Sequence, residues 1–287
     1  MRARNARGSK PGAQKSRARP AFKSWDSYRG FAKAVQQEQR FAQNADSRKF
    51  LMALRKTSRG RLKRLQQGHV LCRAQVGHDW DPIYFDGEPL DDFVPAPFKP
   101  ERMVPDPKYV GDGRANPRGI AYMYLAERIR TAIAEVRPWV GAHVSLGFFE
   151  VLRDLKLVDC SLGHRGIDFL MRRPMRAEWD KLVWKDIDRA FATPVDPADS
   201  TAYIPTQIIA EVFRDEGWDG IAYHSALGEG RNFLIFDLAA TNLIACRLHI
   251  IKGVDYKESE TGQPYGFQRK TKTPASQLKS EESKSVS

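Results

Sequence analysis

Residues 113–137 constrain the fold of this chain more than any other stretch, because a turn, a strand and a helix follow one another there without a break. A polar turn runs from Gly113 to Gly119, and the apolar run 120–126 then predicts a strand. Apolar residues at helical spacing from Ile129 to Val136 predict the helix. Such a unit can bring an Arg, a Tyr and a Glu together over a cleft. The alternative from spacing alone is an exposed turn, a core tyrosine and a surface glutamate.

Composition predicts a soluble globular protein of the cytoplasm. The 287 residues can hold one large domain or two small ones, and 41% of them are hydrophobic. No apolar run approaches the roughly 20 residues needed to cross a bilayer, and no secretory signal is evident. The three cysteines are far apart and odd in number, which fits a reducing compartment rather than a disulfide framework.

The net charge of +12 belongs to the front of the chain. Residues 1–68 hold 19 Lys or Arg and 3 Asp or Glu, whereas residues 69–287 hold 28 and 32. Residues 1–24 contain no acid and few apolar groups, so we expect a disordered basic tail. This basic region can contact nucleic acid nonspecifically through phosphates. The alternatives are a solubilising tail and an ordinary solvated helix face.

The rest of the chain predicts a mixture of helices and strands. Residues 25–68 form a helical N-terminal region, because apolar residues recur at helical spacing from Phe31 to Ala45 and from Phe50 to Leu65. Residues 77–112 contain seven prolines and predict a long loop, whereas residues 254–287 predict a disordered C-terminal tail. The remaining predictions are strands at 70–76, 142–151, 155–159, 219–223, 233–236 and 243–251 and helices at 176–190 and 208–213.

Several familiar chemistries are excluded by their missing patterns. The chain has neither G-x-G-x-x-G after a strand nor G-x-x-x-x-G-K-[ST], so no dinucleotide-binding glycine turn or P-loop is predicted. The six histidines are scattered and none has zinc-ligand spacing to a cysteine, so we expect no metal. His224 and Ser225 are adjacent in a strand and point to opposite faces, which makes them a poor base and nucleophile.

Seven short motifs resemble the RES domain family, which is named for its Arg, Glu and Ser residues. They occur in the family order and cover roughly residues 69–252. The motifs are Leu71-Cys72-Arg73-Ala74, Gly113-Arg114-Ala115-Asn116, Tyr124-Leu125-Ala126, Thr131-Ala132-Ile133-Ala134-Glu135, Pro205-Thr206-Gln207, Asp219-Gly220-Ile221-Ala222-Tyr223-His224-Ser225 and Gly230-Arg231-Asn232.

The resemblance implies an α+β fold with an ADP-ribosyltransferase-like mixed β core and flanking helices. It implies a catalytic domain at residues 69–253 that consumes NAD as its substrate and acts as the toxin of a toxin–antitoxin pair. A cognate antitoxin protein is therefore an expected partner. Many members of the family have an aromatic residue after the first Arg, where this chain has Ala74, so one wall of the expected pocket differs.

The chemistry of NAD cleavage assigns roles to the matching residues. Arg73 and Arg114 are candidates for the pyrophosphate, because a guanidinium pairs bidentately with phosphate oxygens. Glu135 is the candidate that stabilises the positive charge on the ribose when the nicotinamide bond breaks. Tyr124 is the candidate that stacks on nicotinamide, although Tyr122 would share its strand face. Ser225 can orient the ribose or cap a turn, and Asn232 can support a ligand or hold a turn.

These roles predict an enzyme that passes ADP-ribose to water or inorganic phosphate. One alternative is a protein ADP-ribosyltransferase. Another is a non-catalytic protein that binds nucleic acid or a partner through residues 1–68.

Overall fold

The computed structural model describes residues 19–163, 173–195, 199, 201–256 and 258–262. The chain divides into two compact units, Met1–Gly253 and Val254–Ser287. Everything described below lies in the first unit. Residues 1–18 of the predicted N-terminal tail, and most of the predicted C-terminal tail, lie outside the described residues.

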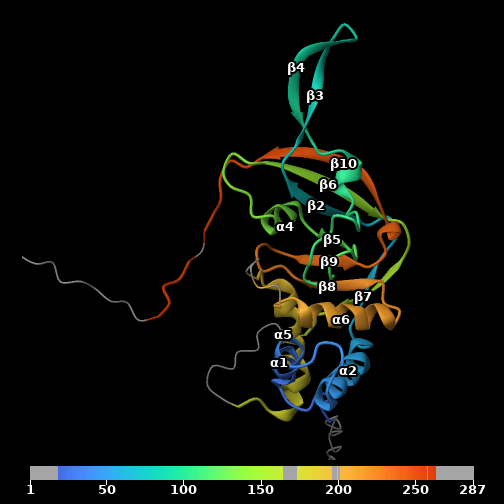
Figure 1. The fold of residues 1–287 in the computed structure, drawn as a ribbon, viewed down its shortest axis with the longest axis vertical. Coiled ribbons are helices and arrows are strands. Elements are labelled where there is room, and N and C mark those ends of the chain that lie inside the picture. Colours follow the sequence, from blue (N-terminus) through green and yellow to red (C-terminus); the bar gives the residue numbers. More distant parts are fainter. Residues whose placement is uncertain (1–18, 164–172, 196–198, 200, 257, 263–287) are drawn as a thin grey trace, which may run out of the picture. The chain divides into compact units, whose positions relative to one another are not determined.

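A mixed sheet of eight described strands runs through the first unit in the order β1-β7-β8-β9-β5-β2-β6-β10 (Figure 1). Strands β7 and β8 are parallel, and every other neighbouring pair is antiparallel. The strands are β1 (Leu62–Leu65), β2 (Val70–Val76), β5 (Met123–Ala126), β6 (His143–Val151), β7 (Leu155–Asp159), β8 (Gly220–His224), β9 (Arg231–Ile235) and β10 (Thr241–Ile250). The predicted α+β class, with a mixed β core and flanking helices, is confirmed.

The pairing between β2 and β5 is the weak point of this sheet. They share one registered pair, Cys72↔Ala126, whereas β2 and β6 share seven pairs. The strand pairing therefore joins two halves of the sheet, one ending at β5 and the other starting at β2, through a single registered pair.

Helices cover one face of the sheet. The helix α4 (Ile129–Glu135) packs Ala132 against Cys72, Ala74 and Ala126. The helices α5 (Trp179–Ala192) and α6 (Ile204–Asp215) form a larger core with Ile221 of β8 and carry α1 (Ser27–Gln37) and α2 (Ala45–Ser58) (Figure 1). On the opposite face, Leu71 and Leu125 pack with Phe98 and with Met103 of the short helix α3 (Pro100–Met103).

The N-terminal helices are tied to the body by aromatic packing. Phe31 stacks on Phe50 with ring centroids 4.4 Å apart, and Phe22 is buried beside them. The Asp180 carboxylate of α5 accepts a hydrogen bond from the Ala21 backbone N–H at 2.9 Å. The last residues of the predicted tail therefore belong to the folded body.

The second predicted helix is shorter than expected. Helix α2 ends at Ser58, and Leu62–Leu65 form β1 instead, paired antiparallel with β7. Pairing with an open sheet edge has overridden the helical spacing of Leu62 and Leu65 after the weak helix former Gly60. The buried Arg61 at this junction donates to the Asp159 carbonyl at 3.0 Å and lies over the Trp184 ring.

The long loop predicted at residues 77–112 is also wrong in part. Its first half is a two-stranded antiparallel hairpin of β3 (Asp79–Phe85) and β4 (Glu88–Ala96) that extends from the β6–β10 end of the sheet (Figure 1). Asp86 and Gly87 form its turn with φ of 52° and 86°, a conformation that Asp-Gly favours. The prolines are tolerated because both strands are edges with free N–H positions.

Candidate active site

The candidate site lies where α4 ends above strands β5, β8 and β9. The register pairs Ala126 with Asn232, and Asn232 with Tyr223, so these three side chains share the sheet face that α4 covers. Glu135 is the last residue of α4, and Ser225 directly follows β8. The chain therefore brings Glu135, Asn232 and Ser225 together from three elements.

Glu135 is held by three side chains. Its Oε1 accepts hydrogen bonds from Ser225 Oγ at 2.8 Å and from Asn232 Nδ2 at 2.6 Å. Its Oε2 lies 3.5 Å from Arg114 Nη1. The Glu135 and Arg114 side chains are only 19% and 13% exposed, so this carboxylate is largely withdrawn from solvent yet still reachable.

Ser225 both orients Glu135 and caps a turn. Its Oγ accepts from the backbone N–H groups of Leu227 and Gly228 at 3.1 and 3.0 Å while donating to Glu135. Of the two roles that the sequence left open for Ser225, the contacts show the turn cap. A hydroxyl donates once and accepts twice, so Glu135 and the two N–H groups engage this one fully.

Arg114 is shared between Glu135 and a tyrosine that sequence reasoning did not select. The Arg114 guanidinium and the Tyr223 hydroxyl interact electrostatically, and each shifts the pKa of the other. Burial lowers the pKa of Arg114, but Tyr223 and Glu135 together raise it above its usual value. Burial raises the pKa of Tyr223 to about 12, so this phenol stays neutral at physiological pH.

Tyr124 is fixed by the turn that precedes its strand. Its hydroxyl donates to Asn116 Oδ1 at 2.7 Å and accepts from the Ala115 backbone N–H at 3.1 Å. Burial raises the pKa of Tyr124 far above its usual value. Gly113 is required here by close approach, since a Cβ would lie 2.4 Å from Asn116 Oδ1 and 3.0 Å from Tyr124 Oη. The turn therefore sets the plane of the tyrosine ring.

Gln207 of α6 binds the same turn through its side-chain amide. Its Nε2 donates to the carbonyls of Gly113 and Asn116 at 3.0 and 3.1 Å. Gln207 and Asn116 are both buried and were quoted in family motifs without a role. For Gln207 the available signal was a polar residue directly before the apolar run that starts at Ile208, whereas Asn116 lies in a polar turn and carries no such signal.

Arg73 lies on the other face of the sheet and does not contact Glu135 or Arg114 among the described contacts. It lies between Cys72 and Ala74, which both face α4, so strand alternation turns its side chain the opposite way. Its Nη1 contacts the Tyr124 carbonyl at 3.4 Å, and its Nε is buried with no hydrogen-bond partner among the described residues. Burial lowers the pKa of Arg73.

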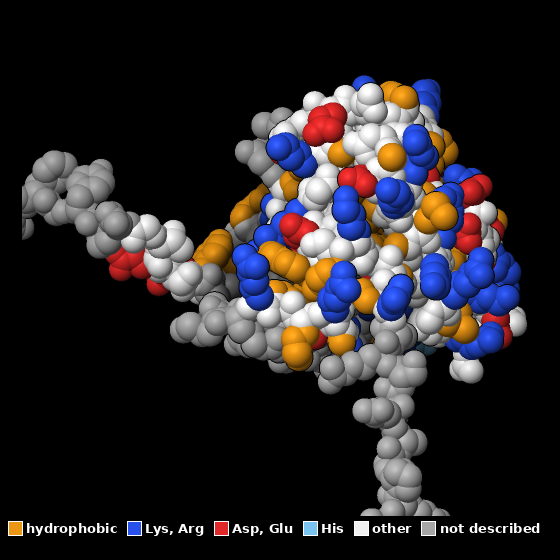
Figure 2. Space-filling view, turned by 90° about the horizontal axis from the view of Figure 1, so that it is seen from below, with side chains coloured by type: hydrophobic (Ala, Val, Ile, Leu, Met, Phe, Trp, Pro, Cys, Tyr) orange, Lys and Arg blue, Asp and Glu red, His pale blue; other side chains and the backbone are white. Residues whose placement is uncertain are grey.

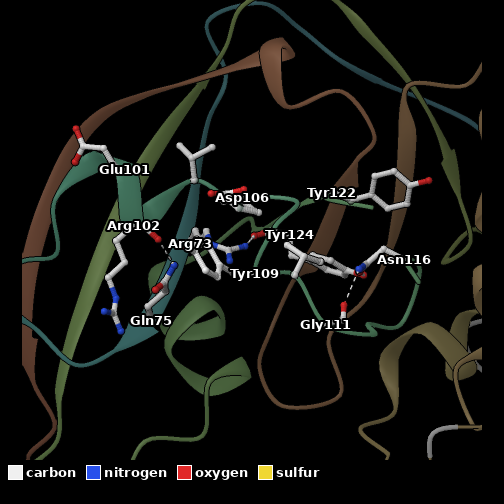
Figure 3. Close-up of a pocket in the computed structure, with 13 residues that line it drawn as sticks. Arg73, Gln75, Glu101, Arg102, Asp106, Tyr109, Gly111, Asn116, Tyr122 and Tyr124 are labelled. Carbon is white, nitrogen blue, oxygen red and sulfur yellow. Dashed lines mark hydrogen bonds between the residues drawn. The ribbon is translucent and has the colours of Figure 1, made fainter. Parts of the chain in front are cut away.

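A cavity of about 560 Å³ opens where β2 and β5 separate (Figure 3). Arg73, Tyr124, Tyr122 and Asn116 line it together with the segment from Val104 to Gly111. Arg114 and Glu135 are not in its wall, and no described contact joins Arg73 to either of them. Tyr124 connects the two groups, because its carbonyl meets Arg73 while its hydroxyl binds the turn that carries Arg114.

The described residues thus form an α+β domain with a hydrogen-bonded carboxylate at the end of α4 and, apart from it, a cavity lined by the buried Arg73. A family model of the RES domain matches residues 90–257, more than half of the chain. The chain belongs to the RES domain family. The match covers Arg114, Tyr124, Glu135, Ser225 and Asn232, whereas Arg73 precedes it.

Other comparisons add little. The chain is similar to a chain in the crystal structure of the M. tuberculosis MbcT–MbcA toxin–antitoxin complex, with 15% identity and a TM-score of 0.39. The similarity covers 69% of this chain and 92% of that chain. A TM-score this low supports no conclusion about fold or function. No curated protein matches the chain.

The described residues contain no cluster of three or more His, Cys, Asp or Glu side chains arranged to hold a metal ion. Their helices include none with the length and apolar character needed to span a membrane.

Proposed function

We propose that this protein is an NAD-consuming enzyme of the cytoplasm that cleaves the nicotinamide–ribose bond and passes ADP-ribose to water or inorganic phosphate. The observation that carries the proposal is the environment of Glu135, whose carboxylate receives hydrogen bonds from Ser225 and Asn232 and faces Arg114. The proposal also follows the NAD chemistry implied by RES membership.

Glu135 would act on the transition state rather than on the bound substrate. Loss of nicotinamide leaves positive charge on the ribose, and a fixed carboxylate stabilises this charge more than it stabilises neutral ribose. Ser225 and Asn232 hold one carboxylate oxygen in place before substrate arrives. The orientation therefore costs little during the reaction, which is the condition for strong electrostatic catalysis.

Arg73 would bind the pyrophosphate from the cavity. A buried guanidinium that leaves Nε without a partner is costly unless an acceptor arrives, and a phosphate oxygen is the acceptor that Arg binds best. The volume of about 560 Å³ lies in the usual range for sites of small ligands. Tyr124, with its ring fixed by Asn116 and Ala115, would supply the wall on which nicotinamide stacks.

Arg114 would have a different role from the one that its type suggests. Its guanidinium already contacts Glu135 and Tyr223, so it is partly engaged. We assign it to the second phosphate or to holding Glu135, and in either role it balances the carboxylate charge. A cognate antitoxin would restrain such an enzyme in the cell, as the toxin–antitoxin role of the family implies.

Incubation of the full chain with NAD, with and without inorganic phosphate, tests the proposal when products are identified by mass. Release of nicotinamide with ADP-ribose is expected for transfer to water, and a phosphorylated ADP-ribose is expected for transfer to phosphate. Label retained on protein would instead favour a protein ADP-ribosyltransferase. Absence of nicotinamide under all conditions, with NAD left intact, would overturn the proposed activity.

A further inference from the structure

The β3–β4 hairpin exposes apolar side chains that the proposed function does not use. Trp80, Tyr84, Phe85 and Phe93 are between 57% and 72% exposed. The register places Trp80 opposite Pro95 and Pro82 opposite Phe93. Trp80, Pro82, Phe93 and Pro95 therefore form one apolar face of the hairpin. An isolated two-stranded hairpin is marginal in water, and exposed apolar faces of this kind mark interaction sites.

The hairpin is also strongly acidic. Residues 79–96 contain six Asp or Glu and no Lys or Arg. Asp79 accepts a hydrogen bond from the Lys99 backbone N–H at 3.1 Å, whereas Asp91 and Asp92 are exposed and make no described contact. The surface that fits this hairpin is therefore an apolar groove with a basic rim.

The same chain carries such a groove at its N-terminal helices. A cavity of about 1220 Å³ lies against α1 and α2. Its apolar lining includes Phe22, Phe31 and Phe50, which are 2% to 5% exposed, and Met52, which is 67% exposed and supplies most of the accessible apolar surface among these four. Figure 2 looks onto the end of the molecule that carries these helices and shows basic side chains spread around apolar ones.

The lining of the groove contains more basic than acidic residues. Its basic residues are Arg19, Lys23, Lys49, Lys56 and Arg176, and its acidic residues are Asp26, Glu38 and Asp46. Lys23 and Lys49 share Asp46 at 3.0 and 3.8 Å, and Lys56 has no ion pair among the described residues. The rim is therefore left with positive charge that acidic side chains can neutralise.

We propose that the β3–β4 hairpin of one copy of this chain docks in the α1–α2 groove of a second copy. The hairpin extends from the β6–β10 end of the sheet, whereas α1 and α2 pack on α5 and α6 beyond β8 (Figure 1). A copy cannot reach its own groove with its own hairpin. The association is therefore head-to-tail, and it continues until a ring closes or a chain of copies grows.

Sedimentation velocity of the full chain at rising concentration tests the docking. We expect the wild type to exceed the 32.6 kDa of one chain and to return toward it as salt is raised. The hairpin variant Asp91→Lys with Asp92→Lys and the groove variant Lys49→Glu with Lys56→Glu should each weaken association by about tenfold or more. The control Lys156→Glu with Glu211→Lys changes two exposed charges that belong to neither the groove lining nor the hairpin and should associate like the wild type.

Mixing the two association-defective variants gives the sharpest result. The hairpin variant keeps an intact groove, and the groove variant keeps an intact hairpin, so the mixture should form one-to-one dimers and nothing larger. Circular dichroism melting of each variant checks that it is folded. NAD turnover is not expected to change, so the docking can fail while the proposed enzyme activity stands.

Two outcomes would overturn the docking. A wild type that stays monomeric at every concentration excludes it, and so does a groove variant that still associates like the wild type. If the monomeric wild type also binds duplex DNA with a salt-sensitive affinity that the groove variant lacks, nucleic acid is the occupant of the basic rim instead.

Discussion

Glu135 and Arg73 are the two charged residues to which the proposed reaction gives opposite tasks, and their surroundings differ accordingly. Glu135 is satisfied within the protein, with Ser225 and Asn232 on one oxygen and Arg114 facing the other. Arg73 has only a 3.4 Å contact to the Tyr124 carbonyl, and its buried Nε has no described partner. One group is complete without ligand, and the other is incomplete.

This difference separates a residue that stabilises the transition state from a residue that binds the substrate. A carboxylate that is already oriented gains nothing from the ground state of a substrate, so its contribution should appear in kcat. A guanidinium that lacks an acceptor gains hydrogen bonds as soon as an anion binds, so its contribution should appear largely in KM. The first two predictions test this division.

The largest expected effect is that of Glu135→Gln. The amide keeps the shape but removes the negative charge, so we expect kcat for NAD cleavage to fall by about 10²- to 10³-fold with a small change in KM. Initial rates of nicotinamide release give both constants. The matched control Glu211→Gln removes an exposed carboxylate of α6 that does not line the cavity and should keep wild-type rates. Undiminished turnover in Glu135→Gln would remove this residue from the mechanism.

Arg73→Ala should mainly weaken NAD binding. Charge-assisted hydrogen bonds contribute about 1.5–3 kcal/mol, so we expect KM to rise by roughly 10- to 100-fold with a smaller loss in kcat. Calorimetric titration with NAD gives an independent affinity. Arg130→Ala removes an exposed arginine of α4 and serves as the control. A pure kcat defect in Arg73→Ala would reverse the division of roles drawn above.

Gly113→Ala tests whether the turn beneath Tyr124 is as tightly set as its contacts indicate. The added methyl would meet Asn116 Oδ1 at 2.4 Å, and relieving that overlap should cost about 1–3 kcal/mol of unfolding free energy. Gly111→Ala is the matched control, because nothing lies within 4 Å of a Cβ built there. Chemical denaturation of both variants gives the comparison, and equal stabilities would show that the turn yields.

Tyr223→Phe should have the smallest effect at neutral pH and a visible one in alkali. Burial raises the pKa of Tyr223 from 10.0 to about 12, so its stabilising contribution is complete below pH 10 and is lost as pH rises through 12. In that window the variant should lose unfolding free energy less steeply, by up to about 1.4 kcal/mol per pH unit. Identical slopes for wild type and variant would contradict the raised pKa.

The sequence predicted the local parts of this site better than its long-range ones. Residues 113–137 form the expected turn, strand and helix, and Arg114 and Glu135 within that stretch meet as expected. Tyr223 escaped selection because its contact with Arg114 spans two distant elements and has no local pattern. The position of Arg73 relative to Glu135 could not be predicted either, since it depends on the pairing of β2 with β5, two strands far apart in the sequence.

The errors elsewhere have equally physical causes. The seven prolines of residues 77–112 led to the prediction of a loop instead of the β3–β4 hairpin. The Asp86-Gly87 turn was the available signal for the hairpin. Leu62 and Leu65 fit a helix by spacing, and only the open edge of β7 made them a strand. In both places the sequence contains the local signal, but it does not reveal which strand will pair with the segment.

The single registered pair between β2 and β5, Cys72↔Ala126, affects how easily the two strands can separate. Arg73 lies on the β2 side of this junction, and Tyr124 and Asn232 lie on the β5 side. A dinucleotide that contacts residues on both sides would hold β2 and β5 together. Its binding would then register as slower amide exchange along β2 and β5, far from the sugar whose bond is broken.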